Sequence, residues 1–159
     1  MKLSQKQVSE YDKKGWILLP EMFSKQEVLV LENAAIDVLQ RRGPEVARET
    51  DDAPHVCWGM HLFDDRFHAL TRHPNLLMPV DQLLKNQVFV HQSRINIKQQ
   101  NGSIVEWHPD FGTYHRVDGV PEARGIMIGV FLDNVTACNA PVLAVPGSHE
   151  EGLVSEAVI

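Results

Sequence analysis

Hydrophobic residues in the first half of the chain recur mostly at helical spacing. The clearest stripe occupies positions three, four or seven residues apart: Val28, Leu31, Ala35, Val38 and Leu39. Ser24 and Glu27 form a capping box in front of this stripe, and Gly43-Pro44 provides a stop signal behind it. The pattern therefore predicts a helix whose apolar face is core and carries no chemistry.

Three shorter helices are predicted from the same kind of signal. Ser4 and Gln7 form a second capping box, which indicates a short helix that stops at Gly15. Residues 64–71 and 75–85 have helical periodicity and are separated by a His-Pro pair. Together with the first helix, these segments make the region up to residue 86 mainly helical.

The segments between the helices give weaker signals. Residues 16–19 read as a short buried strand closed by Pro20. Residues 45–54 are charged and predict a loop, while residues 56–60 are apolar without a clear period. Four histidines are scattered through this half at spacings that fit no metal motif, and we interpret them as surface or helix-end residues: His55, His61, His68 and His73.

Residues 88–98 change the period from helical to alternating, which predicts a strand. One face of this strand carries Phe89, His91, Ser93, Ile95 and Ile97. The other carries Val88, Val90, Gln92, Arg94, Asn96 and Lys98. The four consecutive polar positions of the second face either point to water or line a polar cavity, and alternation alone leaves both interpretations open.

Two more strands are predicted further along, over residues 123–136 and 141–145, the latter ended by Pro146-Gly147. Helices followed by antiparallel strands predict an α+β fold, with the helices packed on one outer face of a sheet sandwich. A double-sheet jelly roll is the form of this architecture that most readily holds a metal. We expect one domain over residues 1–159, helical over 1–86 and containing the first jelly-roll strands over 87–159.

Composition narrows the class of partner. The 159 residues are 43% hydrophobic and 23% charged, as in an ordinary soluble domain. A net charge of −6 and a pI near 5.7 argue against nucleic acid or an anionic membrane as the partner. Two widely spaced cysteines, the absence of a transmembrane-length apolar run and a polar N-terminus predict a cytoplasmic protein with reduced thiols. A small-molecule partner is the remaining expectation.

The candidate chemistry lies in the stretch from Trp107 to Gly112. Because alternate residues of a strand face the same side, His108 and Asp110 at a strand end could bind one metal ion. Two histidines and one carboxylate on one face of an octahedron form the site of non-haem Fe(II) oxygenases. The tripeptide alone is a weak signal, since the chain holds eight histidines. In the alternative interpretation, Asp110 caps a turn and His108 is an ordinary surface histidine.

Five motifs in one order make the signal more specific. They are residues 91–98 (HQSRINIK), 107–113 (WHPDFGT), 118–121 (DGVP), 131–133 (FLD), and the pair 139–141 (NAP) with 146–149 (PGSH). In this order they resemble the phytanoyl-CoA dioxygenase family, in particular the bacterial branch that contains ectoine hydroxylase and proline-hydroxylase-like enzymes.

The resemblance implies a double-stranded β-helix (a jelly roll, cupin-like), an Fe(II) centre and 2-oxoglutarate as cosubstrate. It also implies hydroxylation of a small polar or amino-acid-like substrate. Carried over by position, His108 and Asp110 are iron ligands, Asn96 helps to hold 2-oxoglutarate, and Gln92 contacts the substrate. Tyr114 stands where relatives often have a substrate-packing tryptophan. The polar face of strand 88–98 is then better interpreted as cavity lining.

One departure from the family is large. The resemblance implies a second iron-binding histidine and a 2-oxoglutarate-binding arginine well after residues 146–149, yet no histidine follows His149. His149 matches a turn histidine that is not a ligand, and the family gives His115 no role. We therefore expect an incomplete barrel, poor turnover by this chain alone, and exposed sheet edges that favour a homodimer. The alternatives are a non-catalytic jelly-roll binding module and, more weakly, a zinc hydrolase that uses His108 and Asp110.

Overall fold

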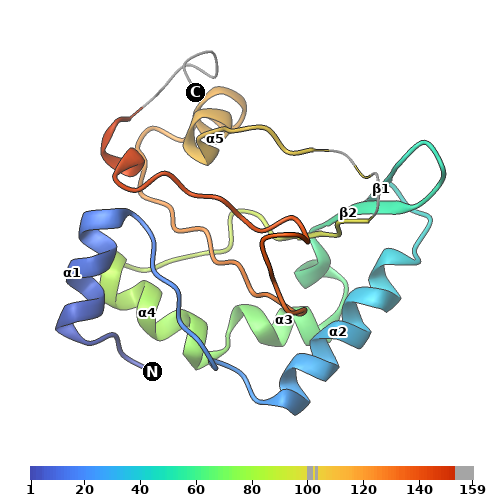
Figure 1. The fold of residues 1–159 in the computed structure, drawn as a ribbon, viewed down its shortest axis with the longest axis horizontal. Coiled ribbons are helices and arrows are strands. Elements are labelled where there is room, and N and C mark those ends of the chain that lie inside the picture. Colours follow the sequence, from blue (N-terminus) through green and yellow to red (C-terminus); the bar gives the residue numbers. More distant parts are fainter. Residues whose placement is uncertain (100–101, 103, 153–159) are drawn as a thin grey trace. The chain divides into compact units, whose positions relative to one another are not determined.

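A computed structural model describes residues 1–99, 102 and 104–152 of the chain (Figure 1). Its elements, in chain order, are α1 (Gln5–Lys14), α2 (Lys25–Leu39), β1 (Val46–Arg48), β2 (Pro54–Trp58), the 3-10 turn η1 (Met60–Leu62), α3 (Asp65–Thr71), α4 (Pro74–Leu84), β3 (Arg94–Asn96), α5 (Asp110–Asp118) and the 3-10 turn η2 (Ser148–Glu150).

These elements divide between two compact units. We call the first the packed unit: it contains Met1, Pro20–Ser103 and Gly129–Pro141. We call the second the motif unit: it contains Lys2–Leu19, Ile104–Ile128 and Val142–Ile159. The prediction of one domain with a helical and a strand half remains a prediction. No helix in the part of the chain that the structure describes is both long and apolar enough to span a bilayer.

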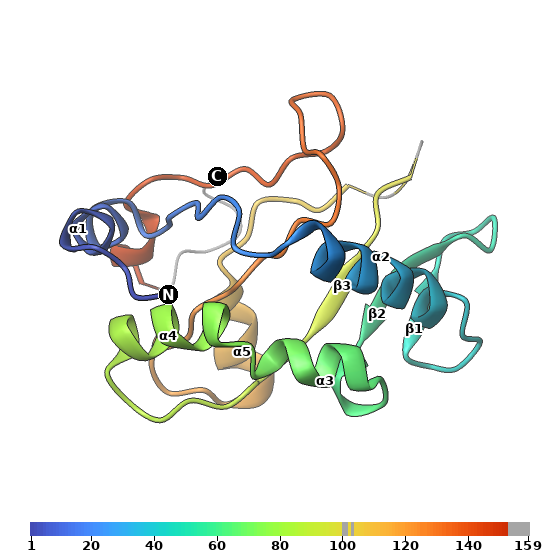
Figure 2. The same ribbon diagram turned by 90° about the horizontal axis from the view of Figure 1, so that it is seen from below.

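The packed unit is built on a three-stranded antiparallel sheet in the order β1-β2-β3 (Figure 2). Cys57 lies at its centre, because it pairs with Val46 of β1 on one side and with Ile95 of β3 on the other. The thiol is fully buried, and burial raises its pKa, so it behaves as a small apolar core group. Cys57 and Cys138 form no disulfide in the described structure.

A single hydrophobic cluster joins this sheet to α2 and α3. Its members are Leu31, Ala34, Ala35, Val38, Leu39, Val46, Cys57, Met60 and Phe67. The first five lie on α2, and the stripe predicted as core supplies four of them: it missed Ala34 and included Val28, which is half-buried. Ile95, Ile97 and Leu132 are partly buried and pack against the cluster. The α+β class therefore follows from packing α2 and α3 on a small antiparallel sheet.

The predicted helices are confirmed, with their ends set by identifiable groups. Ser4 and Ser24 each complete the expected capping box. Gly15 ends α1 in the left-handed region, with φ +81°. The second helix ends at Leu39, earlier than the Gly43-Pro44 stop, and the Arg48 guanidinium donates to the carbonyls of Leu39 and Arg41, at 3.0 and 2.9 Å.

The strand predictions were mostly wrong. Strand β1 lies within residues 45–54, which we predicted as a loop. Strand β2 starts at the end of that loop and runs into residues 56–60, where we saw no clear period. Among the described residues, the predicted strands at 16–19, 123–136 and 141–145 are not strands, and 88–98 contracts to Arg94–Asn96. Alternation identifies a face, but a strand also needs a hydrogen-bonded neighbour, which a local pattern cannot specify.

Within β3 the predicted alternation is confirmed. Ile95 is half-buried against the core, whereas Arg94 and Asn96 are exposed. The same alternation continues into the flanking residues, since Ser93 and Ile97 are half-buried and Gln92 and Lys98 are exposed. The polar face of this segment therefore points away from the hydrophobic cluster.

Candidate metal centre

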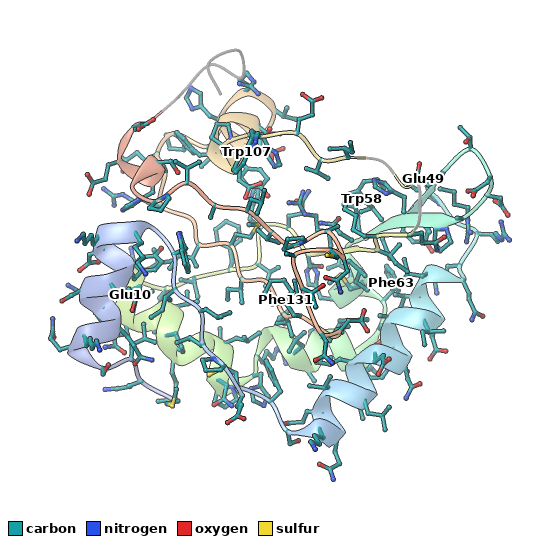
Figure 3. The ribbon with its side chains drawn as sticks, viewed as in Figure 1. Glu10, Glu49, Trp58, Phe63, Trp107 and Phe131 are labelled. Carbon is teal, nitrogen blue, oxygen red and sulfur yellow. The ribbon has the colours of Figure 1, made fainter. Side chains whose placement is uncertain are left out.

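His108 and Asp110 lie where an irregular segment enters a helix, not at a strand end. Residues 104–109 have no regular structure, Pro109 is the extended N-cap residue, and α5 begins at Asp110. The predicted strand geometry of this pair was therefore wrong. The fixed φ of Pro109, together with the first turn of α5, brings the two side chains together instead. Trp107, labelled in Figure 3, precedes them on this segment.

Backbone hydrogen bonding selects the tautomer of His108. Its Nδ1 lies 2.7 Å from the carbonyl oxygen of Glu106. A carbonyl oxygen can only accept, so Nδ1 carries the proton and donates it. In the neutral ring the lone pair is then on Nε2, which lies 3.5 Å from Asp110 Oδ1. Both side chains are about one-third exposed.

This donor pair fits a divalent ion. Two neighbouring ligands of an octahedral ion, each at about 2.1 Å, stand about 3.0 Å apart, so a small rotation from 3.5 Å suffices. A metal-binding histidine usually donates its other ring N–H to a carbonyl or carboxylate, as His108 does to Glu106. Across residues 1–99, 102 and 104–152, however, no three His, Cys, Asp or Glu side chains gather as a ligand set. The assignment of His108 and Asp110 as two ligands of a facial triad stays a prediction.

Tyr114 lies one helical turn after Asp110 on α5, so the two side chains share a helix face. The tyrosine is half-buried. Gly119 ends the helix with φ +68°, and its N–H and that of Val120 both donate to the Tyr114 carbonyl. The sequence patterns missed α5 altogether, although its C-terminal glycine was a usable signal.

His115 is engaged at the end of the same helix. Its Nδ1 lies 2.8 Å from the Val120 carbonyl oxygen, so it too donates from Nδ1. The ring packs at 5.5 Å, centroid to centroid, on Phe111. These contacts give His115 a local structural role.

Asn96 and Gln92 belong to the packed unit, whereas His108, Asp110 and Tyr114 belong to the motif unit. Asn96 is the last residue of β3 and pairs with Val56 of β2. Gln92 lies two residues before the strand begins. The roles assigned to these five residues remain predictions.

His149 fastens the Pro146–His149 turn to the end of α1. Its Nε2 lies 3.1 Å from the Asp12 carbonyl oxygen, and the Gly147 N–H donates to the Lys14 carbonyl at 3.0 Å. A Cβ at Gly15 would overlap the His149 ring. The turn thus satisfies carbonyls at the helix C-terminus, which agrees with a structural role for His149.

A surface hollow of about 380 Å³ lies elsewhere, in the packed unit. It is lined by His61, Leu62, Phe63, Asp64, Asp65 and His68. None of the five predicted site residues is among these lining residues, so the hollow gives no support to their assignment.

Comparison with known proteins places these motifs in a family. A model of the phytanoyl-CoA dioxygenase (PhyH) family matches residues 11–157. The chain is 34% identical over 148 residues to L-proline trans-4-hydroxylase of Streptomyces griseoviridis, covering 92% of this chain and 55% of the relative. It is 34% identical over 155 residues to ectoine dioxygenase of Bordetella bronchiseptica, covering 94% of this chain and 50% of the relative.

Solved structures give the same result. The crystal structure of EctD from S. alaskensis with 2-oxoglutarate and 5-hydroxyectoine aligns with a TM-score of 0.72 and 29% identity, over 77% of this chain and 45% of that one. The same protein with bound Fe aligns with a TM-score of 0.67 and 28% identity, over 71% and 42%. The chain spans about half the length of the curated relatives it matches. It belongs to the phytanoyl-CoA dioxygenase family.

Proposed function

We propose that this chain serves an Fe(II)- and 2-oxoglutarate-dependent dioxygenase reaction that hydroxylates a small polar or amino-acid-like substrate. The relatives named for proline and ectoine support this substrate class, because both molecules are small rings that carry a carboxylate. The likeness to EctD structures holding Fe and 2-oxoglutarate supports the cofactors. A jelly roll is the architecture that we propose around the site.

Each predicted residue has a distinct task in this proposal. His108 and Asp110 hold the iron, the Asn96 amide orients 2-oxoglutarate, and Gln92 and Tyr114 contact the substrate. When bound, the iron and 2-oxoglutarate would activate O2, the oxidant: one oxygen atom would enter succinate as 2-oxoglutarate loses carbon dioxide, and the other would form the new hydroxyl of the substrate. The protein contributes position and exclusion of water, since the difficult chemistry belongs to the cofactor.

The observation that carries the proposal is the pairing of His108 Nε2 with the Asp110 carboxylate. The His108 Nδ1–H donates to Glu106, so Nε2 presents a lone pair 3.5 Å from the Asp110 carboxylate. His115 also donates its Nδ1–H to a backbone carbonyl, so the feature that distinguishes His108 is the carboxylate oxygen beside its Nε2. A nitrogen and an oxygen donor so placed suit a borderline ion such as Fe(II).

The test is anaerobic addition of 2-oxoglutarate to the Fe(II)-loaded 159-residue chain. Chelation of Fe(II) by a 2-oxo acid gives a charge-transfer band in the visible spectrum. We expect the band in the wild type and its loss in His108→Ala and Asp110→Asn. His115→Ala is the matched control, because it removes a histidine of the same unit that uses its Nδ1 locally.

Admission of oxygen extends the same experiment. We expect more succinate from the wild type than from His108→Ala when L-proline or ectoine is present. A band of equal intensity in wild type and His108→Ala would contradict the metal assignment. Binding of 2-oxoglutarate without any metal dependence would favour the alternative, a non-catalytic binding module.

A further inference from the structure

The segment that carries Gln92, Arg94 and Asn96 is held by the sheet along only part of its length. The ladder between β2 and β3 pairs Val56 with Asn96 and ends where Trp58 pairs with Arg94. Gln92 lies beyond that last pair. Its position therefore depends on how the backbone just before β3 is held.

Ser93 is the point at which this backbone is held. The Gly59 N–H donates to the Ser93 carbonyl at 2.8 Å, which continues the connection past the end of the ladder. The Ser93 hydroxyl forms a 2.5 Å hydrogen bond with Nδ1 of His61, thirty-two residues earlier in the chain. Ser93 is thus bonded through both its main chain and its side chain to the turn that begins at Gly59.

The position of His61 is itself determined locally. Gly59 takes φ +66°, and η1 then presents the imidazole toward Ser93. Nδ1 of His68, on α3, lies 3.3 Å from the His61 carbonyl oxygen. Met60, between these residues, is buried in the hydrophobic cluster, so the turn is anchored in the core.

Ser93 and Gln92 are neighbours in the chain, so the way Ser93 is held affects the opposite face of the segment. Ser93, Ile95 and Ile97 are half-buried, whereas Gln92 and Asn96 are exposed. A twist or slip at Ser93 would move Gln92 directly, because neighbouring side chains of an extended segment point to opposite faces. Asn96 would move less, because it lies within the ladder.

We infer that the His61–Ser93 hydrogen bond is a positioning contact that sets the orientation of Gln92 for substrate binding. This inference rests on the proposed function, in which Gln92 contacts the substrate. Neither His61 nor Ser93 is assigned to touch substrate or metal. The pair acts through the backbone that displays Gln92.

The experiment compares Ser93→Ala, His61→Phe, the double variant and His61→Asn with the wild type. Hydrogen exchange of the Gly59 amide reports the connection to Ser93, and the Ile97 amide, which donates to His55, is the internal reference. We expect Gly59 exchange to accelerate about tenfold in Ser93→Ala and His61→Phe, with the double variant no faster than either single one. His61→Asn keeps a polar atom near the Nδ1 position and should restore slow exchange.

The functional readout is the affinity of the Mn(II)- and 2-oxoglutarate-loaded chain for L-proline and for ectoine, the two probes. For whichever probe the wild type binds, we expect the affinity to fall about fivefold to tenfold in Ser93→Ala and His61→Phe. This is the range expected for the loss of one net hydrogen bond. It should recover in His61→Asn. Mn(II) affinity should stay within about twofold throughout, since His108 and Asp110 are unaltered.

The outcomes separate this inference from the function on which it rests. Faster Gly59 exchange with unchanged probe affinity would overturn the positioning role alone. Unchanged exchange in Ser93→Ala would overturn the contact itself. Failure of the wild type to bind either probe would overturn the proposed substrate class and this inference together, while the exchange data would still report on the contact. A His61→Phe variant that does not fold leaves Ser93→Ala and His61→Asn to decide.

Discussion

The packed unit and the motif unit are stabilised in different ways. In the packed unit, α2 alone buries five residues, and these join β1, β2 and α3 in one hydrophobic cluster. In the motif unit, α1 buries no side chain and α5 buries only Gly112. There the contacts that fix the chain are helix caps and backbone hydrogen bonds, such as that from Gly147 to Lys14.

The predicted metal ligands lie in the less buried of the two units. The iron-binding prediction falls on His108 and Asp110, which belong to the motif unit and are about one-third exposed. Binding residues commonly lie on irregular segments supported by a more rigid scaffold. The four predictions below test whether packing dominates one unit and local polar contacts the other.

The largest effect is expected from Phe67→Ala in the packed unit. Phe67 is 3% exposed within the cluster, and its truncation should lower the free energy of unfolding by about 3–5 kcal/mol. Phe89→Ala is the matched control, because the same ring is 83% exposed there and its loss should cost less than about 0.5 kcal/mol. Urea denaturation measures both. Similar midpoints for the two variants would contradict the placement of the core.

Gly15→Ala should give the next largest effect, in the motif unit. The residue has φ +81°, and its new Cβ would overlap the His149 ring, so we expect a loss of about 3 kcal/mol. Gly119→Ala isolates the backbone contribution, because Gly119 has φ +68° with open space around it, and should cost about 1 kcal/mol.

A double variant separates the two causes. His149→Ala removes the ring atoms that the new Cβ would overlap, so Gly15→Ala measured against His149→Ala alone should cost close to the Gly119→Ala value, about 1 kcal/mol. Thermal unfolding followed by circular dichroism measures the series. No relief in the double variant would show that His149 does not pack on Gly15.

Asp64→Asn should have a moderate, pH-dependent effect in the packed unit. Hydrogen bonds from the Arg66 guanidinium, at 2.7 and 3.1 Å, lower the pKa of the Asp64 carboxyl from its ordinary 3.8. Asparagine still caps the helix, so the substitution removes mainly the charge, at a cost of about 1–2 kcal/mol at neutral pH. Urea midpoints from pH 7 to pH 2 measure this cost.

The sign of the pH dependence follows from linkage. A lowered folded-state pKa means that the unfolded carboxyl binds its proton first as the pH falls. The stabilising contribution is therefore complete above about pH 4 and is lost as the pH falls below 3.8 and through the folded-state value. The difference between wild type and variant should shrink over that interval. Asp65→Asn, an exposed neighbour, is the control.

The smallest effects compare the two capping boxes. Ser24→Ala should lower global stability by about 1 kcal/mol, because α2 carries the core. Ser4→Ala removes an equivalent cap from α1, which buries no side chain, and should mainly increase local opening. Hydrogen exchange in α1 and α2, measured beside urea midpoints, distinguishes the two responses. Equal shifts of the global midpoint would mean that both helices unfold with the core.

Some of this molecule is determined by the sequence alone. Capping boxes at Ser4 and Ser24 fix where α1 and α2 begin, because the signal is a hydrogen bond between residues three apart. The apolar stripe of α2 identifies most of the core face, and alternation identifies the buried side of β3. The ordered motifs from His91 to His149 identify the family, since they do not depend on which element each residue occupies.

Only the tertiary structure decides which segments become strands and what surrounds the candidate site. Cys57 lies in a strand because Val46 and Ile95 pair with it from distant positions, and no local period encodes that pairing. His108 and Asp110 meet at the start of a helix because Pro109 and the first turn of α5 direct them there. His61 reaches Ser93 across thirty-two residues. Such hydrogen bonds join residues that are far apart in the sequence, so a short sequence pattern cannot predict them.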